Sequence, residues 1–245
     1  MNILLALFTC HKYQYTTPGS NIKDWFTRPV VDRVSAIRDS WLQDVTGNYR
    51  FFYGRGDASL RKRDEVFLNA PDDYLHSAEK LKALVQWALA NGYDKLVKID
   101  DDMYVYYDRL MANVPVEDYV GSSTGPVRTP AGVNPGNAEW WKKTAIYCSG
   151  CTYWLSKKAM EVLATAPAGC WAEDRWCGET LFRNKIFSTI DNRYYIAPHS
   201  KINQYITDEA LAQPNDYITI HSLSPEQMRR HWKERANEHN QVNVD

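Results

Sequence analysis

Short apolar runs alternate with segments of helical periodicity along most of the chain. The runs rich in apolar and β-branched residues predict strands, and they cover residues 3–10, 49–54, 65–70, 95–100, 118–123 and 193–198. Apolar side chains recur at helical spacing over residues 30–43, 76–92, 156–167 and 224–239. Strands that alternate with helices predict an α/β fold, with a central mixed, mostly parallel sheet flanked by helices.

Two of the predicted helices carry signals at their ends. Asn91-Gly92 follows the apolar pattern of residues 76–92 and is typical of a helix C-terminus. The last helix starts with Ser224 as N-cap, Pro225 at the first helical position and Gln227 completing a capping box. We therefore expect these residues to mark the helix boundaries.

Residues 121–141 are rich in Gly, Pro, Ser and Asn, and they predict a long loop of the kind that often carries function. A linker between two domains is the alternative interpretation. Apolar structure resumes on both sides of this segment without a change of composition, so we expect a single domain over residues 1–245.

Composition and charge exclude a few classes of function. The 245 residues include 29 basic and 30 acidic side chains, and a net charge of −1 gives no general reason to bind nucleic acid or an anionic membrane, although local basic sites are not excluded. The 9 Trp and 16 Tyr residues offer flat apolar faces with a polar group, which suit sugars and bases as well as a core. No run of roughly 18 apolar residues predicts a transmembrane segment.

The start of the chain and its cysteines favour a cytoplasmic protein. The opening apolar run is short and has no basic segment before it, so it is a poor signal peptide and a better first strand. Five cysteines, an odd number, favour reduced thiols. Cys148 and Cys151 form a C-x-x-C pair, but no second pair has the spacing of a zinc site. No histidine flanks Cys148, which indicates a small buried apolar residue instead of a nucleophile.

Three consecutive aspartates, Asp100, Asp101 and Asp102, follow the predicted strand over residues 95–100 and precede another apolar run. In an extended chain Asp100 and Asp102 share one face, and two carboxylates on one face suit Mg²⁺ or Mn²⁺. Like charges repel, so either water solvates all three or a cation offsets them. The spacing alone leaves a metal site and a solvated triplet equally open.

Five short motifs follow one another along the chain. They are AIRDSW, DDYLHSAEK, IDDDMYV, IYCSGCTYWLS and WAEDRWCGETL. In this order, over about residues 30–225, they resemble the β1,3-glycosyltransferase family that includes β1,3-galactosyltransferases, β1,3-N-acetylglucosaminyltransferases and Fringe. The chain departs from the family pattern at Arg175, where valine is usual, and at Cys151, where glycine is common. DDYLHSAEK keeps only Asp72, Tyr74 and Lys80 of its motif.

The resemblance implies a GT-A, Rossmann-like catalytic domain, with its nucleotide-binding part over about residues 1–110 and its acceptor-binding part over about residues 111–245. It implies an inverting transfer of a hexose or N-acetylhexosamine from a UDP-sugar to a saccharide hydroxyl, with galactose or N-acetylglucosamine favoured. The product would carry a β-linkage, and β1,3 is expected from the family.

The resemblance also implies a divalent cation, Mn²⁺ or Mg²⁺, that bridges the donor diphosphate to the aspartates. Asp102 would be the principal ligand and Asp100 would contact the ribose or the water ligands of the metal, with Asp101 behind them. His221 would supply an imidazole ligand, as histidines in this region of related enzymes do, and His199 is a weaker candidate.

An inverting transferase needs a base that takes the proton of the acceptor hydroxyl. Asp174 matches the aspartate that has this role in the family, and the adjacent Glu173 is its rival. Adjacent helical residues point about 100° apart, so only one of the two can face the anomeric carbon. Without the resemblance, both carboxylates are explained as acidic residues at a helix start, where they favour the helix dipole.

Further residues are candidates for the two substrates. Arg33 and Arg38 would meet the diphosphate or the uracil, because guanidinium pairs well with phosphate oxygens, and Lys80 would assist them. All three are also explained as a solvated helix face. Core packing is the better explanation for Trp154. The expected sugar pocket comprises Trp140, Trp141, Tyr147, Ser149, Gly150 and Glu173.

Two other functions fit parts of the pattern. A non-catalytic sugar-binding module would keep the scaffold and the aromatic residues without the base. A metal-dependent phosphohydrolase would use the aspartates, but it needs more His and Asp ligands than the motifs supply. Since the family's membrane anchor and stem are absent from the chain, we expect a cytoplasmic microbial or viral enzyme; a lumenal catalytic domain trimmed of its anchor is the alternative.

Overall fold

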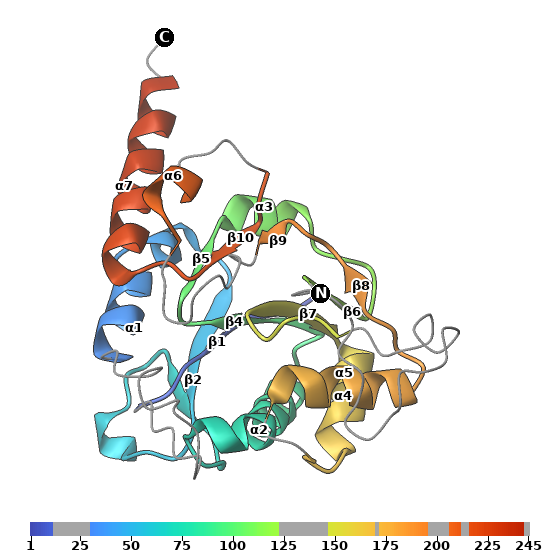
Figure 1. Cartoon of the computed structure of the whole chain (residues 1–245). Helices are drawn as coiled ribbons and strands as arrows, with labels where there is room; N and C mark the ends of the chain where they lie inside the picture. The colour runs from blue at the N-terminus through green and yellow to red at the C-terminus, as the bar shows by residue number, and fades with distance from the viewer. Residues whose placement is uncertain (12–29, 123–146, 170–171, 196–205, 212–215, 243–245) are drawn as a thin grey trace, which may run out of the picture.

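A central seven-stranded sheet dominates the computed structural model, which describes residues 1–11, 30–122, 147–169, 172–195, 206–211 and 216–242 (Figure 1). The strand order is β3-β2-β1-β4-β7-β6-β8. The strands are β1 (Ile3–Phe8), β2 (Asn48–Tyr53), β3 (Glu65–Phe67), β4 (Lys95–Asp100), β6 (Tyr119–Gly121), β7 (Thr152–Ser156) and β8 (Thr189–Ile190).

Most strand pairs of this sheet are parallel. β1 pairs in parallel with both β2 and β4, and β2 pairs in parallel with β3, whereas β7 runs antiparallel to β4 and β6. Phe8 at the end of β1 lies opposite Phe52 on β2 and Asp100 on β4. The carboxyl ends of these strands therefore meet at one edge of the sheet, where α/β proteins bind their ligands.

A second, three-stranded sheet lies beyond this edge. It has the order β5-β10-β9, with β5 (Met103–Val105), β9 (Tyr194–Tyr195) and β10 (Thr219–His221). β10 runs antiparallel to β5, and His221 is the register partner of Met103. This pairing carries a residue from near the C-terminus to the end of the aspartate triplet.

Helices cover both faces of the main sheet (Figure 1). One face packs against α2 (Ser77–Ala90), α4 (Lys157–Thr165) and α5 (Glu173–Arg183), and the other lies under α1 (Val30–Arg38), α3 (Tyr107–Ala112), α7 (Pro225–Val242) and the small sheet. Successive side chains of β1 enter the two cores in turn, with Leu4 on the α2 side and Leu5 on the α1 side. A strand buried on both faces has to be apolar throughout, which explains the continuous run.

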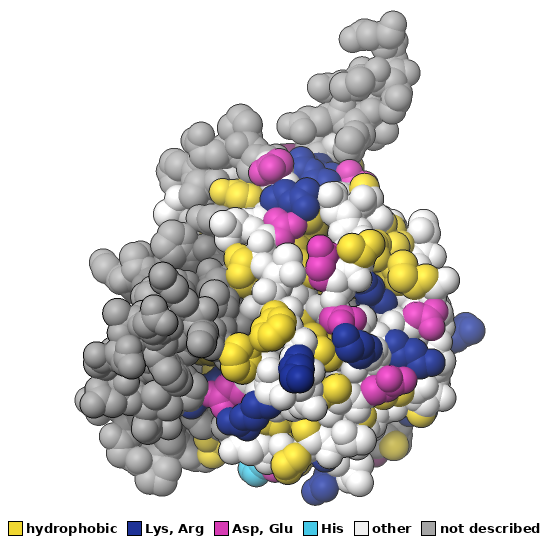
Figure 2. Space-filling model, turned by 90° about the vertical axis from the view of Figure 1, so that its right-hand side faces the viewer, with side chains coloured by type: hydrophobic (Ala, Val, Ile, Leu, Met, Phe, Trp, Pro, Cys, Tyr) yellow, Lys and Arg dark blue, Asp and Glu magenta, His cyan; other side chains and the backbone are white. Residues whose placement is uncertain are grey.

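Shorter helical segments complete the described fold. They are η2 (Trp41–Asp44), η3 (Ala58–Leu60), η4 (Tyr74–His76) and α6 (Asp208–Leu211). Among the described residues, no helix has the length and apolar character that crossing a bilayer requires. Figure 2 shows the right-hand face of Figure 1, where basic, acidic and apolar side chains of the described residues are interspersed and no single kind gathers.

The predicted fold class is confirmed: the protein has an α/β fold with a mixed, mostly parallel sheet between helices. Gly92 has a φ of 76° after α2, and Ser224 and Gln227 form both bonds of the capping box, at 3.0 and 3.1 Å.

The helix predicted over 30–43 is interrupted, because α1 ends at Arg38 and η2 follows. Apolar periodicity does not predict α5, whose first turn is acidic, and most of the loop predicted over 121–141 lies outside the described residues.

Candidate active site

The aspartate triplet lies where β4 ends and the backbone turns into β5. Asp100 is the last residue of β4, and Asp101 and Asp102 form the turn, so the strict alternation expected for an extended chain does not apply to all three. Each carboxylate instead has its own cationic partner within the chain. Basic side chains of the protein itself thus offset the three adjacent negative charges.

Asp101 is the most buried of the three, with 2% of its surface exposed. Its Oδ1 accepts a hydrogen bond from Arg33 Nη1 at 2.8 Å, and its Oδ2 accepts one from Thr9 Oγ1 at 2.7 Å. Arg33 Nη2 also lies 3.8 Å from Asp102 Oδ2. Arg33 on α1 therefore holds the turn in place from inside the protein.

Asp100 contacts Lys98, which precedes it by two positions on the same face of β4. The ammonium of Lys98 donates to Asp100 Oδ1, to the carbonyl oxygen of Gly150 and, at 3.0 Å, to Glu173 Oε1. The Lys98 side chain is 1% exposed, and burial would lower its pKa, but the two carboxylates raise it above the usual value. Lys98 is therefore a buried cation that joins β4 to α5 and to the segment before β7.

Burial, opposed by Lys98 and reinforced by Glu173 and Asp102, raises the pKa of Asp100 to about 7. The side chain of Asp100 is still 32% exposed, so solvent moderates this shift. Asp100 thus faces both the buried lysine and the open side of the turn.

Glu173 and Asp174 begin α5 and have different surroundings. Glu173 is buried against Lys98, whereas Asp174 accepts backbone hydrogen bonds from Gly150 at 3.1 Å and Arg175 at 2.6 Å. Burial and the neighbouring Glu173 raise the pKa of Asp174 to about 6, against the opposing effects of those two amides and of Lys98. Asp100 and Asp174 thus both titrate in the range where a general base is effective, but Asp100 is paired with Lys98, whereas Asp174 is held by backbone amides.

Gly150 brings backbone close to both carboxylates. Its N–H donates to Asp174 and its carbonyl oxygen accepts from Lys98. A Cβ at this position would lie 2.8 Å from Glu173 Oε1, too close for an ordinary contact. Glycine is needed here because the carboxylates and the ammonium use the space beside the backbone.

Asp102 and His221 form the part of the site that is suited to a cation. His221 Nε2 lies 3.5 Å from Asp102 Oδ1, and Ser222 Oγ lies 2.9 Å from His221 Nδ1. Burial would lower the pKa of His221, but the nearby Cys151 and Asp102 raise it well above the usual value. Within the described ranges no group of three or more His, Cys, Asp or Glu side chains is arranged to hold a metal ion.

Two protein ligands are nevertheless sufficient for the cation that the family resemblance implies. Mg²⁺ and related ions are commonly held by one or two carboxylates together with substrate phosphates and water. Asp102 with His221 in its neutral form fits such an ion, because a bound metal would take the place of the imidazole proton that faces Asp102. Asp100, which faces Lys98, fits a contact to the water ligands of the ion or to a nucleotide.

Arg38 and Lys80 bind groups of the chain itself. Arg38 Nη2 lies 2.8 Å from Asp64 and 2.9 Å from Glu65, and its guanidinium stacks on Phe51. Lys80 donates to the carbonyl oxygen of Thr9 and, at 3.0 Å, to Asp72. Of the three basic residues predicted to meet the nucleotide, the structure brings Arg33 into contact with the aspartate triplet. Arg38 pairs with Asp64 and Glu65 instead, and Lys80 with Asp72 and the carbonyl oxygen of Thr9.

The predicted sugar pocket is described only in part. Trp140, Trp141 and His199 lie outside the described residues. Ser149 is buried beside Cys151, with its Oγ 3.4 Å from the sulfur, and a Cβ on Gly178 of α5 would lie 2.1 Å from Tyr147 Cβ. Trp154 is a core residue, as expected, and donates to the hydroxyl of Tyr194 at 2.7 Å. Burial raises the pKa of Cys148 to about 12, as befits an inert thiol.

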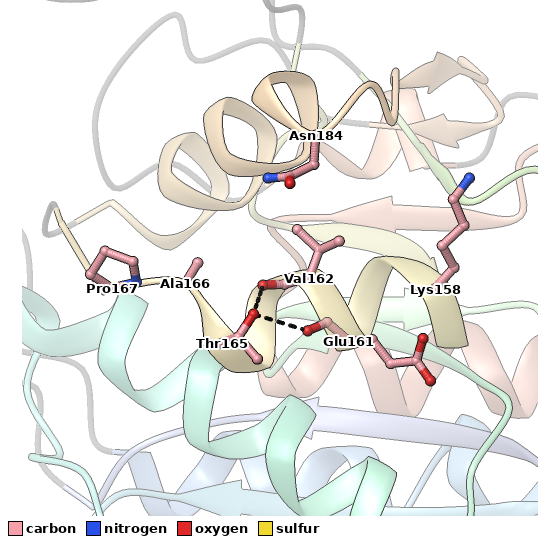
Figure 3. A pocket seen from close by; sticks show the side chains of 7 residues that line it. All are labelled: Lys158, Glu161, Val162, Thr165, Ala166, Pro167 and Asn184. Carbon is pink, nitrogen blue, oxygen red and sulfur yellow. Dashed lines mark hydrogen bonds between the residues drawn. The ribbon is translucent and has the colours of Figure 1, made fainter.

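A surface pocket lies away from these residues, between α4 and the end of α5 (Figure 3). None of the predicted site residues lines it. Thr165 closes one side by bonding to backbone carbonyls of its own helix, and Asn184 faces it from the end of α5. Its lining residues take no part in the network around the aspartate triplet, so the chemistry of the chain points to the sheet edge instead.

The chain matches no protein-family model and no curated protein sequence. It is similar to the structure of a Desulfovibrio desulfuricans G20 protein assigned as a nucleotide-diphospho-sugar transferase, with 14% identity over 78% of this chain and 80% of that chain and a TM-score of 0.44. It is also similar to a glycosyltransferase involved in the glycosylation of the major capsid of PBCV-1, with 11% identity over 96% of this chain and 100% of that chain and a TM-score of 0.45. At such scores and identities the likeness by itself establishes no activity.

Lys98 and Thr9 were not among the residues predicted for the site. Asp102 and His221 were both expected at one cation by resemblance, and they lie 3.5 Å apart. The sequence did indicate the contact between Lys98 and Asp100, because residues two positions apart on a strand share a face. Nothing in the sequence indicated the contact of Thr9 with Asp101, since the two are 92 residues apart along the chain.

Replacing Lys98 by Met should destabilise the protein by about 3–5 kcal/mol, because Asp100 and Glu173 then lose their shared buried cation. The free energy of unfolding in urea measures this loss. Lys95→Met is the matched control, since Lys95 is also buried on β4 but donates to the carbonyl oxygens of Pro115 and Glu117 instead of to carboxylates. Adding Glu173→Gln to Lys98→Met should recover part of the loss; equal losses for the Lys98 and Lys95 variants would contradict this role.

Proposed function

We propose that this chain is an inverting, metal-dependent glycosyltransferase of the GT-A type. It moves a hexose or N-acetylhexosamine, with galactose or N-acetylglucosamine favoured, from a UDP-sugar to a saccharide hydroxyl and forms a β-linkage, β1,3 by resemblance. The observation that carries the proposal is the buried Lys98, which pairs with Asp100 of the aspartate triplet and with Glu173, the residue before Asp174. It thereby holds two acidic centres of different character at one edge of the sheet. Asp102 with His221 forms one centre, and Asp174 with its pKa of about 6 forms the other.

Asp174 fits the base of an inverting transfer. It has to remove a proton from the acceptor hydroxyl, which requires a carboxylate that is ionised at working pH and still basic enough to accept the proton. Two backbone amides orient it, and burial supplies the raised pKa. Glu173 is less suited, because its carboxylate is already engaged by the buried ammonium of Lys98, at 3.0 Å.

Asp102 and His221 would hold the Mn²⁺ or Mg²⁺ ion, and Arg33 keeps the turn in position through Asp101. When bound with the donor, the cation would offset the negative charge that develops on UDP as the glycosidic bond breaks. Asp100 would lie beside the ribose, at the edge where the parallel strands end.

A phosphohydrolase is a poorer fit to the same residues. Such enzymes commonly use two metal ions held by several His and Asp side chains, and the described residues contain no cluster of three. A sugar-binding module without catalysis needs no base. The turnover of Asp174 variants therefore distinguishes such a module from an enzyme.

Donor binding should depend on the cation. Saturation of the protein with UDP-galactose or UDP-N-acetylglucosamine and Mn²⁺, at about 100 times Kd, should add about 2.7 kcal/mol of stability and raise Tm by roughly 5–10 °C. The shift should vanish on chelation of the metal and in Asp102→Asn, while Asp118→Asn, which alters a surface ion pair on the far side of β4, should keep it. A Tm that no UDP-sugar moves with any divalent cation would end the proposal.

Asp174→Asn should lower kcat by roughly 10²–10⁴-fold, because the amide cannot accept the hydroxyl proton. The donor-induced rise in Tm should remain, since the residue contacts the acceptor side. Glu173→Gln should cost less activity if Glu173 serves only to pair with Lys98. If Asp174→Asn turns over normally and Glu173→Gln does not, the two roles are exchanged; if neither variant loses turnover, the base is elsewhere.

The pH dependence of kcat/KM should report the same group. The base must be deprotonated, so kcat/KM should rise tenfold per pH unit below about pH 6, the pKa of Asp174, and level off above it. Binding of the UDP-sugar, measured as the rise in Tm over the same pH range, is the comparison, because binding removes no proton from an acceptor. A kcat/KM that is flat from pH 5 to 7 in the presence of acceptor would exclude Asp174 as the base.

A further inference from the structure

The loop between β2 and β3 differs in charge from the rest of the protein. Residues 55–63 include four cationic side chains, Arg55, Arg61, Lys62 and Arg63, and only one carboxylate, Asp57, in a chain whose net charge is −1. Every residue of this segment is exposed. A local excess of three positive charges is therefore presented directly to solvent.

None of these four cations is in an ion pair with a residue that the structure describes. Most described arginines are in ion pairs, as Arg33, Arg38 and Arg193 are. The side chains of Arg61, Lys62 and Arg63 form no ion pair within 4.0 Å with any residue that the structure describes, and Arg55 bonds only to the amide oxygen of Asn69, at 3.0 Å. The loop therefore keeps its charge available for an anionic partner outside the chain.

An apolar side chain adjoins the cations. Leu60 is 75% exposed and directly precedes Arg61. The neighbouring segment after β3 carries the partly exposed Tyr74 and Leu75, at 41% and 37%. A single exposed leucine is ordinary. An exposed leucine beside three cations that are in no ion pair combines an apolar side chain with basic charge, and interfacial membrane binding uses both.

The loop has a defined shape. Asp57 Oδ1 accepts from Ser59 N at 2.9 Å, which caps η3, and Arg55 N donates to the carbonyl oxygen of Ala70 at 2.8 Å. Gly54 N donates to Asp72 at 2.6 Å and ties the start of the loop to the segment after β3. The loop therefore projects as an ordered unit, seen in cyan after β2 (Figure 1).

We infer that this loop docks the protein on an anionic phospholipid bilayer, with Leu60 entering the interface and Arg61, Lys62 and Arg63 meeting the lipid phosphates. A nucleic acid would use the same cations but would leave Leu60 in water, so a bilayer fits the surface better. The inference is independent of the proposed reaction. Because β2 ends at the same edge of the sheet as β4, docking would turn the edge with Asp100, Asp101 and Asp102 toward the membrane.

The test is co-sedimentation of the whole chain with phosphatidylcholine vesicles, with and without phosphatidylglycerol. We expect binding only to the anionic vesicles and its loss at high salt. The variant Arg61→Ser/Lys62→Ser/Arg63→Ser should lower the partition coefficient on the order of 100-fold. Leu60→Ser should lower it by roughly 10-fold, because an apolar side chain no longer leaves water.

The matched control is Lys157→Ser/Arg183→Ser/Lys233→Ser, which removes the same charge from exposed positions on α4, α5 and α7. It should change the partition coefficient little, since those charges are dispersed. Equal losses in the two triple variants, or no binding to anionic vesicles at all, would overturn the inference. So would single-stranded RNA binding through the same three cations with vesicle binding unaffected by Leu60→Ser, because the loop would then be a site for polyanions.

Discussion

The buried ammonium of Lys98 is the interaction on which the site depends. A lysine with 1% of its side chain exposed is stable only if oxygen atoms replace its lost water. Asp100, Gly150 and Glu173 supply them from β4, from the segment before β7 and from the start of α5. Satisfying one cation therefore fixes the mutual positions of three segments that are far apart in sequence.

That arrangement gives chemically similar carboxylates different roles. Asp101 and Glu173 are each hydrogen-bonded to a buried cation, which fixes their positions and makes them structural. Asp174 is held by neutral backbone amides, and burial raises its pKa to about 6. Environment, more than residue type, thus separates positioning carboxylates from one fit to exchange a proton.

The sheet collects these groups at one edge. Parallel strands β1, β2 and β4 end together, so Thr9, the β2–β3 loop and the aspartate triplet are neighbours along that edge. The small sheet adds His221 from near the C-terminus, because β10 pairs with β5 directly after the triplet. The proposed reaction and the proposed membrane contact would therefore share one side of the molecule.

The sequence by itself determined the α/β class and most of its elements. Strands buried on both faces must be apolar throughout, so their continuous apolar runs can be recognised in the sequence. The helix ends at Gly92 and Ser224 follow local rules of backbone conformation. The sequence also marked Asp102 and Asp174 as candidates through their motifs, and His221 through the position of a histidine in the family that the chain resembles.

The tertiary structure alone decided which charges meet. Arg33 reaches Asp101 and Arg38 reaches Asp64 and Glu65, although both arginines lie on the same helix and looked equivalent in sequence. Lys98 pairs with Glu173, which is 75 residues away along the chain. Asp174 is therefore left without the contact to the Lys98 ammonium that Glu173 has. Such pairings depend on distances across the fold, which local spacing does not encode, because a pKa and an ion pair are set by whatever the folded chain brings within a few ångströms.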